Sequence, residues 1–227
     1  EVWPGGSLGL NLTGAGMLAG EWDESKVRVS HQEFGGRVTQ RDAASFNSSH
    51  ATHVAGTIMA AGVQPDAKGG GYQATLDAYD WNNDASEMAA AAANGLLLSN
   101  HSYGPGGITA ATRYLMGMYD NRCATWDNIA RQAPYYLICK AAGNDRGSFG
   151  PYDCIGTYGN AKNIITVAAV NDVPGGYVNA AGVGMSGFSS WGPTDDGRIK
   201  PDISANGVGL YSSESSGDAD YSNKSGT

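Results

Sequence analysis

Three polar residues, Asp23, His50 and Asn144, have side chains suited to moving a proton and binding a developing negative charge. A carboxylate bonded to an imidazole fixes its tautomer and stabilises its charged form. A carboxamide is a neutral donor suited to a tetrahedral oxyanion. Each residue alone also has a structural explanation: a turn or cap for Asp23, a hydrogen-bonded histidine for His50, and a left-handed turn for Asn144. The Asp23 and His50 pair is therefore more informative than either member.

A metal site is the obvious competing interpretation, because His50 and His53 are three residues apart. Helices of zinc proteases instead carry histidines four residues apart with a glutamate between them, and no glutamate stands here. We therefore expect no metal ligation by this pair, and we expect His53 to pack or to hydrogen-bond beneath the site. His31 and His101 are expected in loops, and neither has ligand spacing.

The elements that must position these residues alternate between apolar runs and helix-length segments. Apolar runs without alternating polarity are typical of a parallel sheet covered on both faces, so the sequence predicts an α/β fold with a mostly parallel central sheet flanked by helices. The predicted strands are Met17–Trp22, Ala74–Trp81, Leu96–Ser99, Tyr135–Ala142 and Asn163–Val170. The predicted helices run from the caps Ser48 and Ser49 to Gly62, and over Ser86–Gly95 and Thr125–Gln132.

Such sheets carry their chemistry at the carboxyl ends of the strands. Asp23, Asn100 and Asn144 all fall at these ends in the predicted arrangement. Two rigid turns around short strands are predicted between Phe188 and Asp202, where Pro193 and Pro201 constrain the backbone. Residues 1 to 16 show no strong periodicity and are predicted to be a surface segment.

Composition narrows the function classes. The 227 residues carry a formal net charge of −8, which disfavours a nucleic-acid partner. No apolar run reaches the ~18 residues that a membrane span requires. Without a repeat, linker or low-complexity tract, the sequence predicts one domain over residues 1–227. Cys123 and Cys154 are expected to form a bridge only if their Cα atoms lie within ~7 Å, and Cys139 is expected to be free.

Several motifs, taken in order, resemble the subtilisin-like serine protease family, the subtilases, from Met17 to the last residue. They are GEWD at 20–23 followed by HQEF at 31–34, HATHVAGT at 50–57, NHSYG at 100–104, AGN at 142–144, and FSSWGP to KPD over 188–202. The resemblance implies a subtilisin-like three-layer fold and a serine endopeptidase acting by acyl transfer without a catalytic cofactor.

The resemblance also implies a role for each matching residue. Asp23 orients His50, His50 is the general base, and Asn144 stabilises the oxyanion. The substrate strand would be Ser102, Tyr103 and Gly104, pairing with an extended polypeptide. Tyr103 and the loop around Gly106 would shape the side-chain pocket.

The sequence departs from the family pattern at two places. Ala51 replaces the glycine of the family's HGTH motif, and a helical conformation tolerates this methyl group. Ser225–Thr227 matches the start of the GTS nucleophile motif, and the sequence stops one residue before the serine. We expect one of two situations. Either the chain is cleaved between Thr227 and the serine, and the following segment stays associated, or the serine is chemically modified. A truncated fragment, or an inactive subtilase-like peptide-binding module, is the alternative, although retention of Asp23, His50 and Asn144 argues against the inactive module.

Two further expectations come from the resemblance. Structural calcium is common in the family, and acidic loops around Asp145, Asp153, Asp172 and Asp195 offer oxygen ligands, although no spaced loop motif occurs. Family members are mostly exported, and the low lysine content and missing initiator methionine fit a mature secreted bacterial enzyme.

Overall fold

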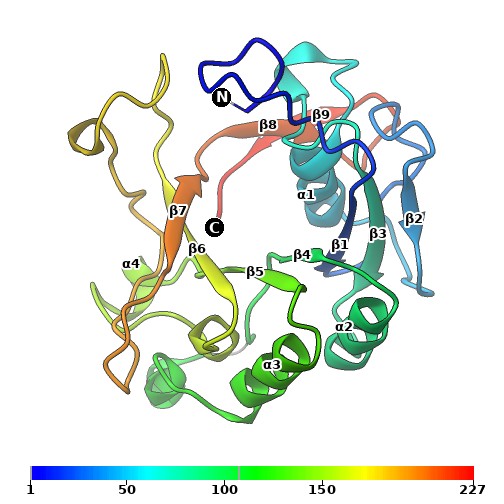
Figure 1. Cartoon of the computed structure of the whole chain (residues 1–227). Helices are drawn as coiled ribbons and strands as arrows, with labels where there is room; N and C mark the ends of the chain where they lie inside the picture. Colours follow the sequence, from blue (N-terminus) through cyan, green and yellow to red (C-terminus); the bar gives the residue numbers. More distant parts are fainter. Residues whose placement is uncertain (1, 107) are drawn as a thin grey trace. The chain divides into compact units, whose positions relative to one another are not determined.

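The computed structural model describes residues 2–106 and 108–227, which form two compact units (Figure 1). The first unit comprises the chain up to Asp84 together with Leu96–Ser99 and Leu210–Lys224. The second comprises Ala85–Gly95, Asn100–Gly209 apart from residue 107, and Ser225–Thr227.

Seven strands form the main sheet, in the order β2-β3-β1-β4-β5-β6-β7. The pairs β1–β3, β2–β3, β5–β6 and β6–β7 are all parallel, which confirms the predicted α/β class. The strands are β1 Leu18–Asp23, β2 Val38–Gln40, β3 Thr75–Asp80, β4 Leu98–His101, β5 Leu137–Ala141, β6 Ile165–Val170 and β7 Ile203–Asn206. A separate antiparallel hairpin consists of β8 Leu210–Ser213 and β9 Tyr221–Lys224.

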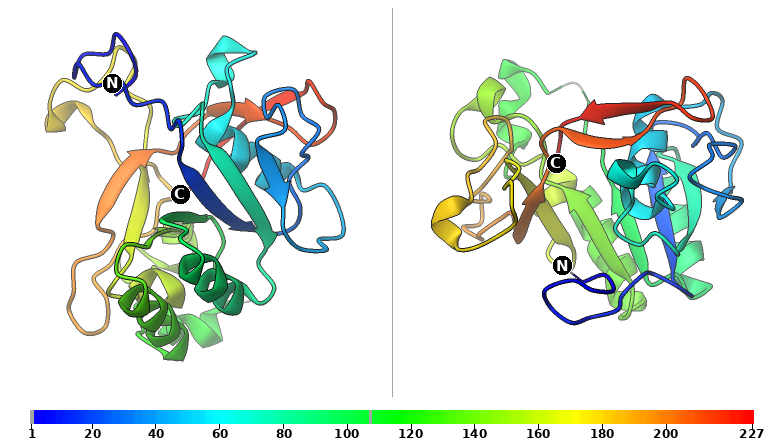
Figure 2. Two further views of the ribbon diagram at one scale, coloured as in Figure 1. Left: turned by 45° about the vertical axis from the view of Figure 1, so that its right-hand side comes forward. Right: turned by 90° about the horizontal axis from the view of Figure 1, so that it is seen from above.

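In the first unit, helix α1, Ser49–Met59, packs its small buried residues against β1 and β3. Ala51, Ala55 and Met59 join Leu76 and Phe34 in a buried apolar cluster. The β8–β9 hairpin, orange and red in Figure 2, lies against α1. A Cβ at Gly56 would collide with the Ser212 hydroxyl, so this close approach requires glycine.

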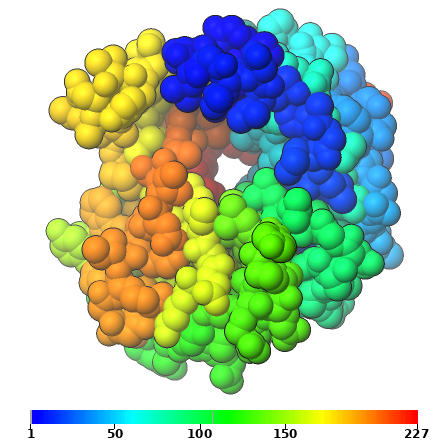
Figure 3. Space-filling model, viewed as in Figure 1, coloured from blue at the N-terminus to red at the C-terminus, as the bar shows by residue number. Residues whose placement is uncertain are grey.

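One buried carboxylate, Glu33, supports the chain that follows α1. Its oxygens accept hydrogen bonds from the backbone N–H groups of Gly62, Val63 and Gln64, at 2.7, 3.0 and 2.7 Å. The Tyr221 hydroxyl of β9 also donates to Glu33, at 2.7 Å. Residues 2–16 lie at the surface, dark blue in Figure 3, as expected for this segment.

In the second unit, helix α3, Asn121–Gln132, begins at Asp120, whose side chain accepts from the N–H groups of Arg122 and Cys123. Asp127 of this helix accepts from the backbone N–H groups of Lys162 and Asn163 and so fixes the approach to β6. The other helices are α2 Asp84–Ala93, which begins at the boundary of the units, and α4 Arg146–Phe149. Short 3₁₀ helices occupy Pro65–Ala67, Ala110–Leu115, Thr157–Asn160 and Ala180–Gly182.

Several element boundaries differ from those predicted. Helix α1 ends at Met59, before Gly62, because Ala60 already leaves the helical conformation. Asn100 and His101 belong to β4 and not to a loop, and His101 is fully buried. Within Phe188–Asp202 no strand forms, since the chain there makes turns before β7 begins at Ile203. Strands β2, β8 and β9 were not predicted, because they are short and rich in polar residues.

Candidate active site

The first unit brings Asp23 and His50 together. Asp23 is the last residue of β1, and its side chain is 1% exposed. His50 is the second residue of α1, and its imidazole is 45% exposed. Nδ1 of His50 lies 2.7 Å from Oδ1 and 2.9 Å from Oδ2 of Asp23. With the carboxylate as acceptor, Nδ1 carries the proton, and Nε2 is left as the basic nitrogen of the neutral ring.

The first turn of α1 is held by Ser48. Its Oγ accepts from the Ala51 N–H at 2.9 Å, which makes Ser48 the N-cap. The same hydroxyl donates to the Glu24 carboxylate at 2.6 Å, and the Glu24 N–H donates to Asp23 Oδ1 at 2.7 Å. The helix that carries His50 and the strand end that carries Asp23 are therefore joined by a second connection beside the Asp23–His50 bond.

Replacement of Ser48 by alanine should lower the free energy of unfolding by about 1 kcal/mol, because the N-cap acceptor is lost. Urea denaturation followed by circular dichroism measures this change. Ser148→Ala, at an exposed serine, is the control and should change stability by less than about 0.5 kcal/mol. Equal effects of the two substitutions would contradict a specific capping role.

The environment of His50 favours its charged form. The hydrogen bond to Asp23 raises the pKa of His50, and the negative charges of Asp23 and Glu24 act in the same direction. Partial burial and the positive charge of Lys224 oppose this increase. An imidazole with a raised pKa accepts a proton readily while remaining neutral enough, at mildly alkaline pH, to act as a base.

A second carboxyl group, Glu21, lies in the same strand two residues before Asp23 and is 0% exposed. Among the residues that the structure describes, neither of its carboxyl oxygens has a hydrogen-bond partner. Burial, followed by the charge of Asp23, raises the pKa of Glu21 well above its usual value of 4.5. Glu21 is thus a buried carboxyl group whose surroundings favour its protonated form. A single acidic residue inside an apolar strand was the sequence signal for it.

Glu21→Gln should make the protein more stable than the natural chain at neutral and alkaline pH. In the unfolded chain Glu21 loses its proton near pH 4.5, whereas in the folded protein it keeps it. Its stabilising contribution is therefore complete below pH 4.5 and is lost as the pH rises through the raised folded pKa. Glutamine does not titrate, so the variant does not lose stability in this way. The free energy of unfolding of the variant should therefore exceed that of the natural chain by an amount that grows with pH.

Urea denaturation between pH 4 and pH 9 measures that difference. Glu21→Leu, which also removes the buried polar atoms, should be about 1–3 kcal/mol more stable than the glutamine variant at every pH. A natural chain whose stability follows that of the glutamine variant in parallel across this range would contradict the buried, protonated assignment.

In the second unit, Asn144 follows β5 and is held by the last residue of the chain. Its Oδ1 accepts from the Thr227 N–H at 3.1 Å and from the Thr227 hydroxyl at 3.3 Å. The Gly143 N–H donates to the same hydroxyl at 3.0 Å, with Gly143 in the left-handed region at φ 108°. Since Oδ1 is engaged in this way, the NH₂ group is the part of the Asn144 side chain that can donate to a ligand, and it lies 3.5 Å from the position that a Cβ on Gly226 would take. Asn144 is itself exposed.

The predicted substrate residues Ser102, Tyr103 and Gly104 also lie in the second unit, directly after β4. The Asn100 amide donates to the Ser102 hydroxyl at 2.9 Å. The Tyr103 ring packs into an aromatic cluster, 6.5 Å from Trp126 and 6.3 Å from Tyr158 between centroids. The predicted loop around Gly106 extends into residue 107, which lies outside the described residues.

A buried lysine beneath this segment was missed by sequence reasoning. Lys140 of β5 is 3% exposed and donates to the carbonyl oxygens of His101, Tyr103 and Ala141. It thereby fixes the carbonyl group of Tyr103, inside the predicted substrate segment, and that of His101, directly before it. A lysine inside the apolar strand was the only sequence signal for this role.

The other histidines and the cysteines have structural roles. His53 contacts the carbonyl oxygens of Leu210 and Ser222 at 2.9 and 3.2 Å, which agrees with the expected role beneath the site. His31 lies in a loop, as expected, where it is buried and contacts the Asp220 carbonyl at 2.9 Å. All three cysteines are free thiols, so no bridge joins Cys123 and Cys154.

The predicted acidic loops do not form a common metal site. Within residues 2–106 and 108–227 no three His, Cys, Asp or Glu side chains converge. The carboxylates of Asp153 and Asp195 approach each other beside Gly117, and one Asp153 oxygen is buried without a hydrogen-bond partner. Two carboxylates alone fall short of the six to eight oxygens that calcium takes, so this pair would need backbone carbonyls and water as well.

The strand order and the Asp–His pair at the carboxyl end of β1 define a class: an α/β protein with a buried carboxylate bonded to an imidazole at a strand end. The profile of the subtilase family, Peptidase S8, matches residues 14–227, and the chain belongs to this family. Membership supports a serine protease that acts on polypeptides. Among the described residues, no helix is long and apolar enough to cross a membrane.

Solved structures share the fold at 21% sequence identity over 95% of this chain. The self-cleaved protease domain of PatA has a TM-score of 0.67, with 76% of that chain covered. The patellamide maturation protease PatA has a TM-score of 0.68 with 74% covered, and a cold-adapted subtilisin-like serine proteinase has 0.65 with 71% covered. A search of curated proteins finds no match.

Proposed function

We propose that this chain forms the catalytic domain of a secreted bacterial serine endopeptidase with an Asp23–His50–serine triad. The observation that carries the proposal is the 2.7 Å contact between Asp23 and His50 Nδ1 in a member of the subtilase family. In this proposal residues 1–227 belong to a single catalytic domain. In this proposal Asp23 and His50 supply the base, and Asn144 supplies the donor for the oxyanion.

The nucleophile in this proposal is a serine supplied by a segment that follows Thr227, either continuous, cleaved and still associated, or chemically modified. The contacts of Thr227 with Asn144 and Gly143 support this assignment. A residue bonded to the carbonyl of Thr227 would begin within a few ångströms of the Asn144 side chain, since consecutive Cα atoms are about 3.8 Å apart.

In the proposed reaction, the serine Oγ attacks the carbonyl carbon of the peptide bond while His50 Nε2 takes the hydroxyl proton. Asp23 stabilises the imidazolium, and the Asn144 NH₂ group donates to the oxyanion. Collapse of the tetrahedral intermediate breaks the C–N bond, and His50 returns the proton to the leaving amine. Water then attacks the acyl-enzyme by the same route and restores the serine.

The proposed substrate is an extended polypeptide that pairs with Ser102, Tyr103 and Gly104 by strand addition. The contacts of Lys140 with the carbonyls of His101 and Tyr103 support a rigid edge for this pairing. No cofactor is needed for the chemistry. Structural calcium remains a proposal, with Asp153 and Asp195 as the carboxylates that would contribute to a site.

Incubation of the intact polypeptide with a serine-directed phosphonate reagent tests this function. We expect hydrolysis of an internally quenched peptide to be lost, with one phosphonyl group added to a serine and not to the 1–227 segment. His50→Gln should remove both hydrolysis and labelling. Hydrolysis that continues in fully labelled protein, or in the His50 variant, would reject the mechanism, and absence of hydrolysis in unlabelled protein would favour a peptide-binding role.

A further inference from the structure

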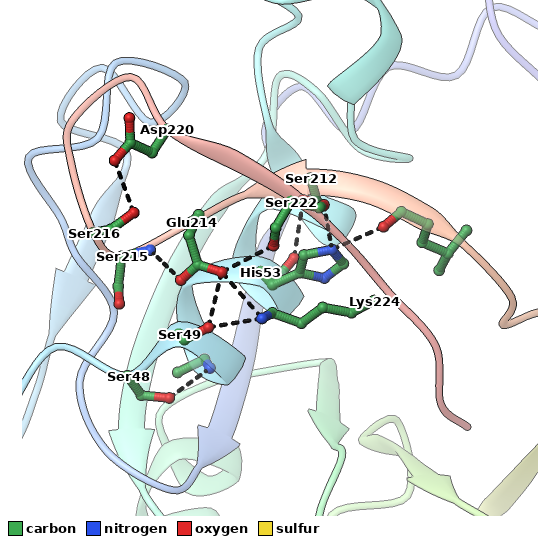
Figure 4. Close-up of polar contacts among 12 residues, drawn as sticks. Ser48, Ser49, His53, Ser212, Glu214, Ser215, Ser216, Asp220, Ser222 and Lys224 are labelled. Carbon is green, nitrogen blue, oxygen red and sulfur yellow. Dashed lines mark hydrogen bonds and ion pairs between the residues drawn. The ribbon is translucent and has the colours of Figure 1, made fainter.

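The β8–β9 hairpin is joined to the first turn of α1 by four polar side chains, which we call the hairpin cluster: Ser49, Glu214, Ser222 and Lys224 (Figure 4). The hydroxyls of Ser49 and Ser222 donate to Glu214 Oε2 at 2.9 and 2.8 Å. Lys224 Nζ donates to the same carboxylate oxygen at 3.0 Å and to Ser49 Oγ at 2.7 Å. All four residues belong to the first unit.

The two charges of the hairpin cluster are held in fixed positions. The side chains of Glu214 and Lys224 are 16% and 31% exposed. Burial raises the pKa of Glu214, but the hydrogen bonds from Ser49, the Ser215 N–H, Lys224 and Ser222 outweigh it and lower the value to about 2. Glu214 therefore stays ionised in the folded protein at any pH where the enzyme would work.

The ammonium of Lys224 is bonded to the residue that precedes His50 in the chain. The charged groups that face His50 come from two directions. Asp23 and Glu24 lie at the end of β1 and favour the imidazolium, whereas Lys224, from the hairpin, disfavours it. Glu214 partly neutralises Lys224, and burial raises the pKa of Glu21, which favours its uncharged form.

We propose that Lys224 is a positioning residue for His50: anchored by Glu214 and Ser49, it holds the first turn of α1 and fixes a positive charge beside the residue that precedes His50. The catalytic meaning of this role rests on the proposed function, whereas its effect on His50 does not. Through Lys224 and Glu214, the β8–β9 hairpin influences the pKa of His50 while the Asp23–His50 hydrogen bond stays unchanged. Glu214 sets the strength of this effect, since it is the counterion of Lys224.

Two substitutions should move the titration of His50 in opposite directions. Lys224→Met removes the opposing positive charge and should shift the midpoint to higher pH. Glu214→Gln leaves Lys224 without its counterion and should shift the midpoint to lower pH. Lys224→Arg, which keeps the charge, should restore the natural midpoint. Both shifts should shrink in 1 M salt, where charges are screened over about 3 Å.

The measurement is a pH titration of the imidazole ¹H–¹⁵N resonances in the intact polypeptide, with His50 assigned by its loss in His50→Gln. Lys162→Met and Asp66→Asn remove the same charges at exposed residues outside the hairpin cluster and should leave the midpoint unchanged. Circular dichroism checks folding of each variant. If one variant fails to fold, the sign of the other shift still decides the question.

Shifts of the same sign, or no shift in a folded variant, would overturn the inference. Opposite shifts in a protein that does not hydrolyse peptides would retain it and reject the protease function. In an active enzyme, the acid limb of kcat/KM should follow the two midpoints. Hydrolysis with an acid limb that is the same in all variants would retain the protease and reject the role of Lys224.

Discussion

Asp23→Asn is expected to lower kcat/KM for peptide hydrolysis by about 10⁴-fold, because the carboxamide can donate to His50 Nδ1 and hold the wrong tautomer. In the natural chain the carboxylate accepts from Nδ1 at 2.7 and 2.9 Å, so Nε2 is the nitrogen that would receive the serine proton in the proposed reaction. The loss should appear in kcat, measured under saturating peptide. The pKa of His50 should fall at the same time, since its hydrogen bond to Asp23 is the largest cause of the increase.

The fall in the pKa of His50 also determines how the activity of Asp23→Asn depends on pH. His50 is the base only when neutral, so activity should rise as the pH increases through its raised pKa. In Asp23→Asn this rise should begin at lower pH, although the plateau is far lower. Asp66→Asn is the matched control at an exposed carboxylate and should retain full activity. A loss below tenfold in the Asp23 variant would remove this residue from the catalytic assignment.

Asn144→Ala should reduce kcat by about 10²- to 10³-fold with little change in KM, because its NH₂ group would donate only to the charge that develops in the transition state. Its orientation depends on Thr227, which holds Oδ1 by two hydrogen bonds. Thr227→Val removes the hydroxyl contact and should give a smaller loss in the same parameter. Steady-state kinetics on a single peptide over a range of concentrations separates kcat from KM.

Asn94→Ala is the control for this substitution, since Asn94 is exposed directly after α2 and its amide donates to the Ala90 carbonyl at 2.8 Å. It should leave both kinetic constants unchanged. An Asn144 variant that instead raises KM at constant kcat would indicate a substrate-binding role, and the oxyanion assignment would then be wrong.

Apolar runs and cap residues were enough to predict the strands and helices around the site. β1 ends at Asp23 as expected, and Ser48 caps the helix of His50. Both features depend on local sequence, through the burial of apolar side chains and a hydroxyl before the first turn. The Asp23–His50 contact was predicted from the strand ends and the family resemblance together.

The electrostatic surroundings of His50 were not predicted from the sequence. Glu21, Glu214 and Lys224 are separated by up to about 200 residues of chain, and only the packing of β1, α1 and the β8–β9 hairpin makes them neighbours of one site. Their pKa values depend on burial and on partners that no local pattern encodes. The same applies to Lys140, whose acceptors are backbone carbonyls of another strand.

Glu33 binds the stretch after α1 through the main-chain amides of residues 62–64, so these hydrogen bonds do not involve the side chains of that stretch. Substitutions at positions 63 and 64 should therefore be tolerated, provided that neither becomes proline, which has no amide hydrogen to donate. Position 62 also requires glycine, because its φ of 85° lies in the left-handed region and a Cβ there would lie 3.0 Å from the Lys68 side chain.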